Sequence, residues 1–362
     1  MIRVMIFSIV SFVLALTATA SDPKDVAQQY LHEFREKHGY ASVSAAVSIG
    51  DTVVYAGAAG FADIDAEVPA TPATMYRIGS VSKVMTAIGV MQLVEAGEID
   101  LDQPILNYMP NGSGNWAGVT PRQLLTHTSG IMHYGSGHPW NRQQEFKSVF
   151  DVVRLFADEK LLFKPGHDQR YSTYGFTLLH AIAETVSKKG FEDYLRDKVW
   201  QPANMTRTMF DRIDARPKMR AKGYKPWAFG RLGRLKETED NVSFKYAGGG
   251  ILSTPSDMVK LCDAFLSDKL VSQDVRMEMM RKQVGNFGLG WNVVIKREGG
   301  LHRVYHSGES LGYYAILNCY PAQNYAFAMT INTWNGGSNV FRDPIEFFAE
   351  TFAAIPRQPD FW

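Results

Sequence analysis

The chain has 362 residues, of which 45% are hydrophobic and 21% charged, as in an ordinary soluble globular protein with a substantial core. Lysine plus arginine number 38 and aspartate plus glutamate 37, so the formal net charge is only +1. No basic block occurs along the chain. This composition argues against binding to nucleic acid or to anionic lipid by charge, and we expect neither partner.

The first 20 residues predict a secretory signal peptide. Arg3 gives a short positive flank, Val4 to Leu16 are mostly apolar, and Ala18-Thr19-Ala20 resembles a small-residue cleavage site. The apolar stretch is shorter than the roughly 20 residues that span a bilayer. An uncleaved anchor or an organellar leader is the alternative. The remaining domain, residues 21–362, is therefore expected to be secreted or extracytoplasmic, with no membrane attachment after cleavage.

The chain carries two cysteines, Cys262 and Cys319, and three N-x-S/T triplets, at Asn111, Asn204 and Asn241. Two cysteines cannot form a disulfide framework. One bridge between them is possible, but buried free thiols are the preferred interpretation. In a secreted eukaryotic chain the three asparagines could carry glycans.

The first hundred residues predict a helix, a hairpin and a second helix. Residues 25–37 have the spacing of an amphipathic helix. Residues 41–61 predict two strands joined at Gly50-Asp51, a hairpin signal. Residues 81–96 predict a long helix rich in Val, Met, Ile and Leu.

The middle and the end of the chain have different patterns. Residues from about 105 to 240 read mostly as loops and helices, with a clear amphipathic helix at 175–189. After Gly248-Gly249-Gly250, a Thr/Ser capping segment opens a helix at 254–268. Four successive strands and a last helix follow, at 291–296, 301–308, 313–320, 325–334 and 343–355.

Short turns between the last strands predict an antiparallel meander. We expect an α+β fold in which strands from both chain ends form one antiparallel sheet flanked by the terminal helices. The α/β part comprises about 24–105 and 245–362, and a mainly helical part, about 106–244, is inserted between them. A cleft between the two parts is the expected site.

Ser80 stands three positions before Lys83 in the segment IGSVSKVMTA (78–87), at an expected helix start. Side chains at i and i+3 share a helix face. A lysine whose pKa is lowered by burial could serve as the base that activates the serine hydroxyl. A helix cap followed by a solvated lysine has the same pattern, and Ser21 and Lys24 repeat the spacing where no active site is expected.

Two later segments add chemistry to this pair. Tyr171 precedes the helix at 175–189, where a phenol could relay a proton in a cleft if nearby cations favour the phenolate. His306-Ser307-Gly308 ends one strand, and its glycine would let a substrate backbone approach closely. The backbone N–H of Glu309 could pair with that of Ser80 to hold an oxyanion. Packing roles alone would also explain each segment.

The three segments, in this order, resemble the serine β-lactamase and penicillin-binding-protein superfamily, whose signature is S-x-x-K, Y-x-N or a relative, then K-T-G or H-x-G. The class C β-lactamase-like branch, and within it the animal lactamase-like serine proteases, is most similar. The likeness runs from about residue 30 to about 350. Further matching segments are YRIGSVSK, LLTHTSGI, YSTYGFTLL, AGGGILSTPSDM and FGLGW.

The resemblance implies a serine hydrolase that cleaves peptide, amide or ester bonds of a small-molecule or peptide substrate, without a cofactor. Ser80 would be the acylated nucleophile, Lys83 its base and Tyr171 the proton relay. His306 would replace the strand lysine and favour a substrate carboxylate or the ionised tyrosine. The N–H groups of Ser80 and Glu309 would form the oxyanion hole, beside Ser307 and Gly308.

The chain departs from the family pattern at three positions. Thr173 stands where β-lactamases have Asn, His306 replaces Lys, and Glu309 places a carboxylate at the cleft mouth, where it could repel anionic substrates. These departures argue against antibiotic hydrolysis but leave acyl transfer to water intact. They also motivate an alternative function, a catalytically weak relative with a binding or self-assembling structural role. The oligomeric state stays open.

Two other constellations carry no predicted chemistry. His127, His133 and His138 match no zinc-helix spacing, so no metal site is expected, and His127 is expected to support the cleft wall through hydrogen bonds. Gly248-Gly249-Gly250 lacks the lysine of a phosphate loop. A tight turn or close packing beneath the cleft explains it better.

Overall fold

The computed structural model describes residues 21–134, 144–226, 232–234, 241–334 and 338–356. The predicted signal peptide, residues 1–20, lies outside this range. The largest sheet has seven strands in the order β3-β2-β1-β12-β11-β10-β9, and every neighbouring pair is antiparallel. Its strands are β1 (Ser42–Ile49), β2 (Thr52–Asp63), β3 (Val68–Pro69), β9 (Asn292–Ile295), β10 (Leu301–Ser310), β11 (Tyr313–Tyr320) and β12 (Tyr325–Ile331).

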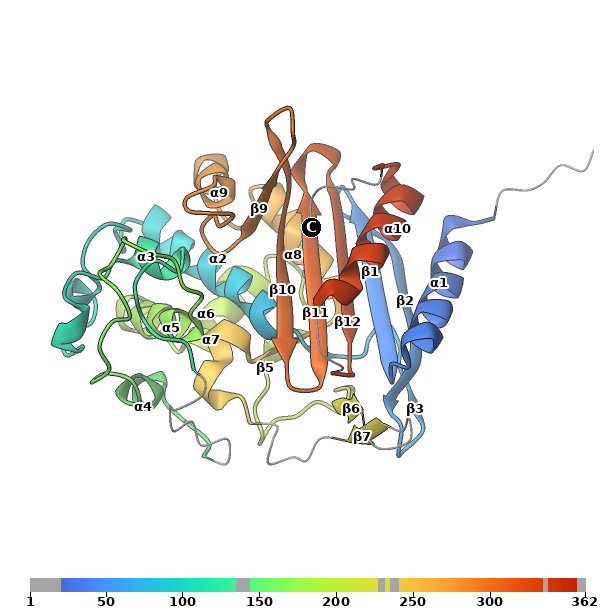
Figure 1. Ribbon diagram of the computed structural model, residues 1–362, viewed down its shortest axis with the longest axis horizontal. Helices are drawn as coiled ribbons and strands as arrows, with labels where there is room; N and C mark the ends of the chain where they lie inside the picture. The colour runs from blue at the N-terminus through green and yellow to red at the C-terminus, as the bar shows by residue number, and fades with distance from the viewer. Residues whose placement is uncertain (1–20, 135–143, 227–231, 235–240, 335–337, 357–362) are drawn as a thin grey trace, which may run out of the picture.

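The sheet joins the two ends of the chain. Strand β1 lies between β2, its hairpin partner, and β12 from the end of the chain, with Val47 opposite both Tyr55 and Phe327. Figure 1 shows the blue and red strands side by side. The predicted antiparallel sheet built from both chain ends is therefore confirmed.

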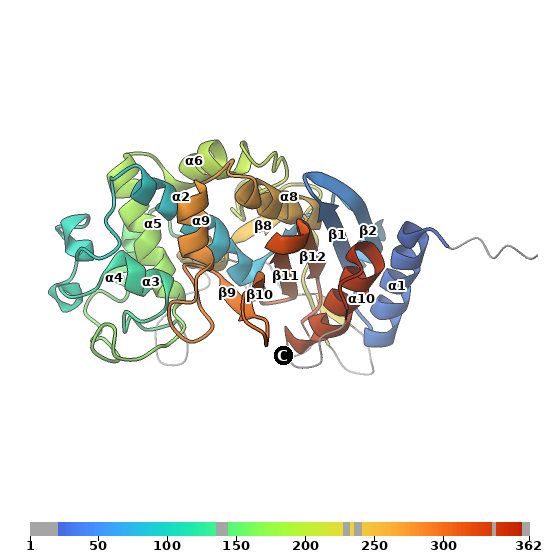
Figure 2. The same cartoon turned by 90° about the horizontal axis from the view of Figure 1, so that it is seen from above.

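Helices cover the two faces of the sheet. Helix α1 (Pro23–His38) packs on β1 and β2, and α10 (Arg342–Ala353) packs on β12, β1 and α1. Helix α8 (Pro255–Leu266) packs on β1, β11 and β12 from the other side, as Figure 2 shows. Successive side chains of β1 point to opposite faces of the sheet. Ala45 and Val47 therefore join the core beneath α1 and α10, whereas Ala46 joins the core on the other face.

The N-terminal helix shows how local signals set element ends. The side chain of Asp22 accepts a hydrogen bond from the backbone N–H of Lys24, and Pro23 occupies the first turn. Gly39 ends the helix in the left-handed conformation at φ 66°. The apolar stripe Ala27, Leu31 and Phe34 faces the sheet and is buried.

Helix α2 (Ser82–Glu95) runs from the sheet into the helical part. It is apolar all round, and its residues from Ser82 to Met91 are all buried, as expected for a helix in the middle of a core. It contacts α5 and α7. The elements around it are α3 (Pro121–Leu125), α4 (Val149–Arg154), α5 (Thr173–Ser187), α6 (Phe191–Leu195), α7 (Tyr246–Gly249) and α9 (Gln273–Met280).

Short strands complete the fold. Strands β4 (Tyr76–Arg77), β8 (Ile251–Ser253) and β5 (Met209–Phe210) form a small sheet, and β6 (Tyr224–Pro226) pairs with β7 (Leu232–Arg234). The fold is therefore α+β, with an antiparallel sheet, terminal helices on one face and a mainly helical part, as predicted. In the described part of the chain, every helix is too short or too polar to cross a lipid bilayer.

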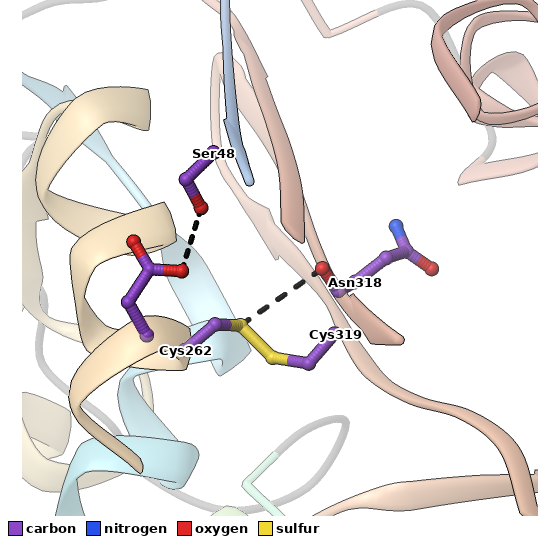
Figure 3. The surroundings of a disulfide bond; sticks show 5 residues. Ser48, Cys262, Asn318 and Cys319 are labelled. Carbon is purple, nitrogen blue, oxygen red and sulfur yellow. Dashed lines mark hydrogen bonds between the residues drawn. A yellow bond between two sulfur atoms is a disulfide. The ribbon is translucent and has the colours of Figure 1, made fainter. Parts of the chain in front are cut away.

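The preferred interpretation of the cysteines as free thiols is wrong. Cys262 on α8 and Cys319 on β11 form a disulfide, with their Cα atoms 5.8 Å apart (Figure 3). The bond ties a helix to the sheet on which it packs. The sequence could not settle this, because the pairing depends on a helix and a strand 57 residues apart being brought into register.

The three potential glycosylation sites differ in exposure. Asn111 and Asn204 are exposed. Asn241 is only 4% exposed, and its side-chain nitrogen donates to the carbonyl oxygen of Gln144. The folded chain therefore does not present Asn241 for glycan attachment.

Candidate active site

A tight turn at the start of α2 brings Ser80 and Lys83 together. The 3-10 turn η1 (Gly79–Val81) leads directly into the helix, and the hydroxyl of Ser82 donates to the carbonyl oxygen of Gly79 at 2.7 Å. Ser80 is partly exposed whereas Lys83 is fully buried. The Lys83 Nζ lies 3.2 Å from the Ser80 Oγ, so the predicted pair meets at hydrogen-bond distance.

Lys83 has neutral partners. Its Nζ donates to Thr173 Oγ1 at 3.0 Å and to the backbone carbonyl oxygen of Gly248. Burial, with a contribution from the positive charge of Lys245, holds the pKa of Lys83 well below its usual value. A neutral amine has two hydrogens and one lone pair. With Gly248 and Thr173 as acceptors, the lone pair is left for the Ser80 hydroxyl.

Tyr171 completes this cluster from the loop before α5. Its hydroxyl is hydrogen-bonded to Ser80, and its ring lies 4.8 Å from the Lys83 Nζ. Ser172 fixes the position, because its Oγ caps α5 by accepting from the N–H of Gly175 at 3.0 Å. Burial raises the pKa of Tyr171, although the bond to Ser80 opposes the rise. The group is therefore a phenol at rest, so the condition that nearby cations favour the phenolate is not met.

Two histidines support the first residues of α5. The Nδ1 of His127 accepts from the N–H of Ser172 at 3.2 Å, and the Nδ1 of His133 accepts from the N–H of Thr173 at 3.1 Å. Burial and the charge of Lys83 lower the pKa of His127, and the same causes lower that of His133 to about 4. Both imidazoles are therefore neutral acceptors. The predicted supporting role of His127 is confirmed, while His138 lies outside the described residues.

Strand β10 forms the opposite wall. Glycines allow its backbone to touch the turn before Ser80, since a Cβ on Gly308 would lie 3.0 Å from the Ser80 nitrogen and a Cβ on Gly79 would lie 2.6 Å from the Glu309 nitrogen. The two N–H groups expected to hold an oxyanion therefore belong to backbone segments in direct contact. Ser307, between His306 and Gly308, pairs with Ile316 of β11.

His306 differs from its expected role as a substitute for a cationic lysine. It is only 4% exposed, and its Nδ1 lies 2.6 Å from the carbonyl oxygen of Ser307. Burial and the charge of Lys83 lower its pKa to about 4, so the ring is neutral near pH 7. Its ring centroid lies 6.4 Å from that of Tyr171. A neutral imidazole can position Tyr171 but cannot attract a substrate carboxylate by charge.

A cleft with a volume of ≈ 470 Å³ opens above Ser80. Of the predicted site residues, Ser80, Tyr171 and Glu309 line it. The others are not part of the lining: Lys83, Thr173, His306, Ser307 and Gly308. Glu309 is exposed, and its Oε1 accepts from the indole N–H of Trp334 at 2.6 Å. The remaining lining residues are Arg77, His133, Tyr134, Asn241, Val242, Phe244, Lys245, Ser310, Leu311 and Trp334.

The sequence interpretation missed two features of this cleft. The carbonyl of Gly248 accepts from Lys83, and a Cβ at Gly248 would lie 2.5 Å from Thr173 Cγ2, so the glycine run packs closely beneath the site as expected but also binds Lys83. Lys245 lies in the cleft wall two residues before Ala247. A lysine beside a glycine run in an apolar segment was the only available signal.

Residues 27–349 match the profile of the Beta-lactamase family. The chain belongs to the β-lactamase family. Among sequence relatives, the mouse serine beta-lactamase-like protein LACTB, mitochondrial, is 27% identical over 82% of this chain and 72% of its own length. The family assignment agrees with the resemblance found in the sequence motifs.

Solved structures share the fold of the β-lactamase family member described here. The octameric penicillin-binding protein homologue from Pyrococcus abyssi is 25% identical, with a TM-score of 0.77 over 91% of this chain and 76% of its own. The D-amino acid amidase from Ochrobactrum anthropi SV3, complexed with D-phenylalanine, is 23% identical, with a TM-score of 0.78 over 91% and 99%. The amidase shows the common fold, and the family and its relatives support a serine hydrolase in general.

Proposed function

We propose that this β-lactamase family member is a hydrolase that cleaves peptide, amide or ester bonds through a covalent acyl-enzyme on Ser80. Lys83 is the base and Tyr171 the proton relay. The observation that carries the proposal is the meeting of a hydroxyl, a buried amine and a buried phenol at one end of α2. An amine and a phenol buried beside a serine in a cleft are the features of an activated nucleophile.

Acylation follows from the hydrogen bonds. Ser80 Oγ attacks the substrate carbonyl carbon while its proton passes to the neutral Nζ of Lys83, 3.2 Å away. The carbonyl oxygen becomes an oxyanion that the N–H groups of Ser80 and Glu309 stabilise. When the carbon–heteroatom bond breaks, Tyr171 gives its proton to the leaving group and recovers one from the Lys83 ammonium.

Deacylation reverses the proton path. A water molecule takes the place of the leaving group, gives a proton to the Tyr171–Lys83 pair and attacks the ester carbon. The Ser80 oxygen leaves with that proton, and the carboxylic acid product is released. Because Tyr171 is a phenol at rest, its part is to transfer protons rather than to abstract one permanently.

The alternative of a catalytically weak binding or structural protein rests on the departures at Thr173, His306 and Glu309. Thr173 keeps a hydroxyl within 3.0 Å of Lys83 and so still orients the amine. His306 remains packed against Tyr171. The departures at Thr173 and His306 therefore leave every group of the proposed proton path in place. This favours hydrolysis over a purely structural role.

Labelling by a fluorophosphonate probe tests the nucleophile. We expect one adduct per chain, mapped to Ser80 by mass spectrometry, and none in Ser80→Ala. Ser21→Ala is the matched control, because Ser21 and Lys24 share the spacing of the pair but are exposed. Turnover of p-nitrophenyl esters and short peptides measures hydrolysis directly. A folded wild-type chain that neither reacts with the probe nor hydrolyses any ester would overturn the proposal.

We also propose that the mature chain works outside the reducing cytosol. The Cys262–Cys319 disulfide supports this, since such bonds persist mainly in oxidising compartments. Thiol alkylation of the protein taken directly from its source, before and after reduction, checks it. Two alkylated cysteines before reduction would contradict it.

A further inference from the structure

Lys245 is a buried cation in the wall of the cleft. It is the last residue of η7 (Ser243–Lys245) and is only 7% exposed, yet it lines the same cleft as Ser80. A Cβ on Gly249 would lie 3.7 Å from both Lys245 Cε and the carbonyl carbon of Gly79, so the end of the lysine side chain lies beside the peptide that leads into Ser80.

Within the described residues, the contacts of Lys245 supply no countercharge. Its Nζ donates to Tyr134 Oη at 3.4 Å and to Ser310 Oγ at 3.5 Å, both long hydrogen bonds. The rings of Tyr134 and Phe244 lie 5.3 and 5.6 Å from the same atom. In the described part of the chain, no carboxylate lies within 4.0 Å of it. An ammonium has three donors, and a buried charge is normally paired.

Other charged residues in the cleft lining are already engaged. Arg77 forms a buried ion pair with Asp211. The carboxylate of Glu309 accepts from Trp334. Among these charged residues of the cleft lining, Lys245 differs because its hydrogen-bond partners are neutral hydroxyls. We infer that Lys245, with the hydroxyls of Tyr134 and Ser310, forms a subsite for a carboxylate carried by the substrate.

The strand indicates which part of the substrate carries this carboxylate. Along β10, His306 packs against Tyr171, which serves the leaving group, whereas Ser310 contacts Lys245. The oxyanion peptide at Glu309 lies between them in sequence. The subsite therefore lies on the acyl side of the scissile bond, and the substrate class is an acyl donor with a carboxylate in its acyl part. This inference rests on the proposed hydrolase function.

A pair of substrates separates this inference from the hydrolase proposal. N-succinylglycine p-nitrophenyl ester carries a carboxylate on its acyl part, and N-(4-methylpentanoyl)glycine p-nitrophenyl ester replaces that carboxylate with an isopropyl group of similar shape. Because glycine has no chiral centre, a preference of the enzyme for L or D residues cannot affect either ester. The measured quantity is the ratio of kcat/KM for the two esters. We expect wild-type enzyme to favour the succinyl ester by about tenfold or more, as one buried charge contact would give.

Variants assign the ratio to Lys245. We expect Lys245→Met to reduce it to about one and Lys245→Arg to retain most of it, because arginine keeps the charge. Taking the ratio within each variant cancels any effect of Lys245 on the base, Lys83. If Lys245→Met fails to fold, Ser310→Ala replaces it, with an expected threefold or smaller ratio relative to about tenfold in the wild type.

The outcomes are distinct. A wild-type ratio near one, in an enzyme that hydrolyses both esters, would overturn the carboxylate subsite and leave the hydrolase proposal standing. A high ratio that survives in Lys245→Met would assign the preference to another residue and also overturn it. An absence of both hydrolysis and Ser80 labelling would overturn the hydrolase proposal and this inference together.

Discussion

Two buried basic side chains near the cleft have opposite surroundings. Arg77, 1% exposed, forms a close ion pair with the carboxylate of Asp211, which also accepts from Arg220 at 3.0 Å. Lys83, fully buried, has two hydroxyls and a carbonyl as hydrogen-bond partners. Of the two, Arg77 alone has a countercharge among the residues that the structure describes.

The difference separates a structural cation, Arg77, from the proposed base, Lys83. Burial alone would raise the pKa of the Asp211 carboxyl, but Arg77 and Arg220 more than offset that effect and lower it. This pair is locked in its charged form. Lys83 has hydroxyl and carbonyl acceptors but no carboxylate partner among the described residues, and burial lowers its pKa. A lowered pKa is what the proposed role of Lys83 as a base requires.

The largest expected effect comes from replacing the proposed base, Lys83. Lys83→Met should lower ester hydrolysis and Ser80 labelling by about 10³- to 10⁴-fold, because the serine loses its base. Its free energy of unfolding should stay the same or rise, since a buried amine is replaced by an apolar group of similar size. Steady-state kinetics and urea unfolding measure both.

Lys24→Met is the matched control for this variant, because Lys24 follows Ser21 at the same spacing but is exposed. Both its kinetics and its stability should equal those of the wild type. Turnover retained in Lys83→Met would mean that Lys83 is not the base. The contrast with Arg77 would then have no chemical meaning.

The structural cation should respond in the opposite way. Asp211→Asn leaves Arg77 and Arg220 buried without their carboxylate, and we expect a loss of about 3–5 kcal/mol in the free energy of unfolding. The control is Asp102→Asn, which breaks a partly exposed pair with Arg122 and should cost about 1 kcal/mol or less. Equal losses in the two variants would contradict the assigned difference.

A smaller effect concerns pH and His306. Its pKa is about 4 in the folded chain and 6.5 in the reference state, so the unfolded chain binds a proton first as the pH falls. Its contribution to stability is complete above about pH 6.5 and is lost toward pH 4, by about 3 kcal/mol. In urea unfolding, the free energy of unfolding of His306→Asn should fall by about 3 kcal/mol less than that of the wild type between pH 7 and pH 4. If the free energies of the two proteins fell in parallel with pH, the assignment of a neutral, buried ring would be contradicted.

The smallest effect lies far from the cleft, beside the disulfide. The Ser48 hydroxyl, labelled in Figure 3, donates a hydrogen bond to Asp263 Oδ1. The Oδ2 of Asp263 has no partner among the described residues. Burial raises its pKa to about 6, so its stabilising contribution is complete below pH 3.8 and is lost as the pH rises through 6. Asp263→Asn should therefore stabilise the chain by about 2 kcal/mol at pH 8 but not at pH 3.5. Thermal unfolding at both values checks this sign.

Long periodic elements could be predicted from the sequence. The helix expected at 175–189 is α5 (Thr173–Ser187), and the strands expected at 301–308 and 313–320 are β10 and β11. Their apolar spacing reports which face is buried, and caps mark their ends. The small sheet of β4, β8 and β5 was missed, because strands of two or three residues carry no period.

The site residues could be predicted where they stand in local sequence motifs, but their surroundings in the folded chain could not. The order of Ser80, Lys83 and Tyr171 in recognisable motifs could be found in the sequence, and the structure brings their side chains together. The neutral state of His306 could not, because it depends on burial that only the folded chain creates. Lys245 was missed for a related reason, since its place in the cleft depends on how η7 packs against Gly79 and β10.

The close contact between the turn at Gly79 and strand β10 at Gly308 limits how the chain could be re-engineered. A Cβ at Gly308 would lie 1.9 Å from the carbonyl oxygen of Ile78, so any larger residue there would push the strand away from Ser80. A mutant library should therefore hold Gly79 and Gly308 constant. Diversity placed at Leu311 and Trp334 would change the lining of the cleft and leave Ser80, Lys83 and Tyr171 in place.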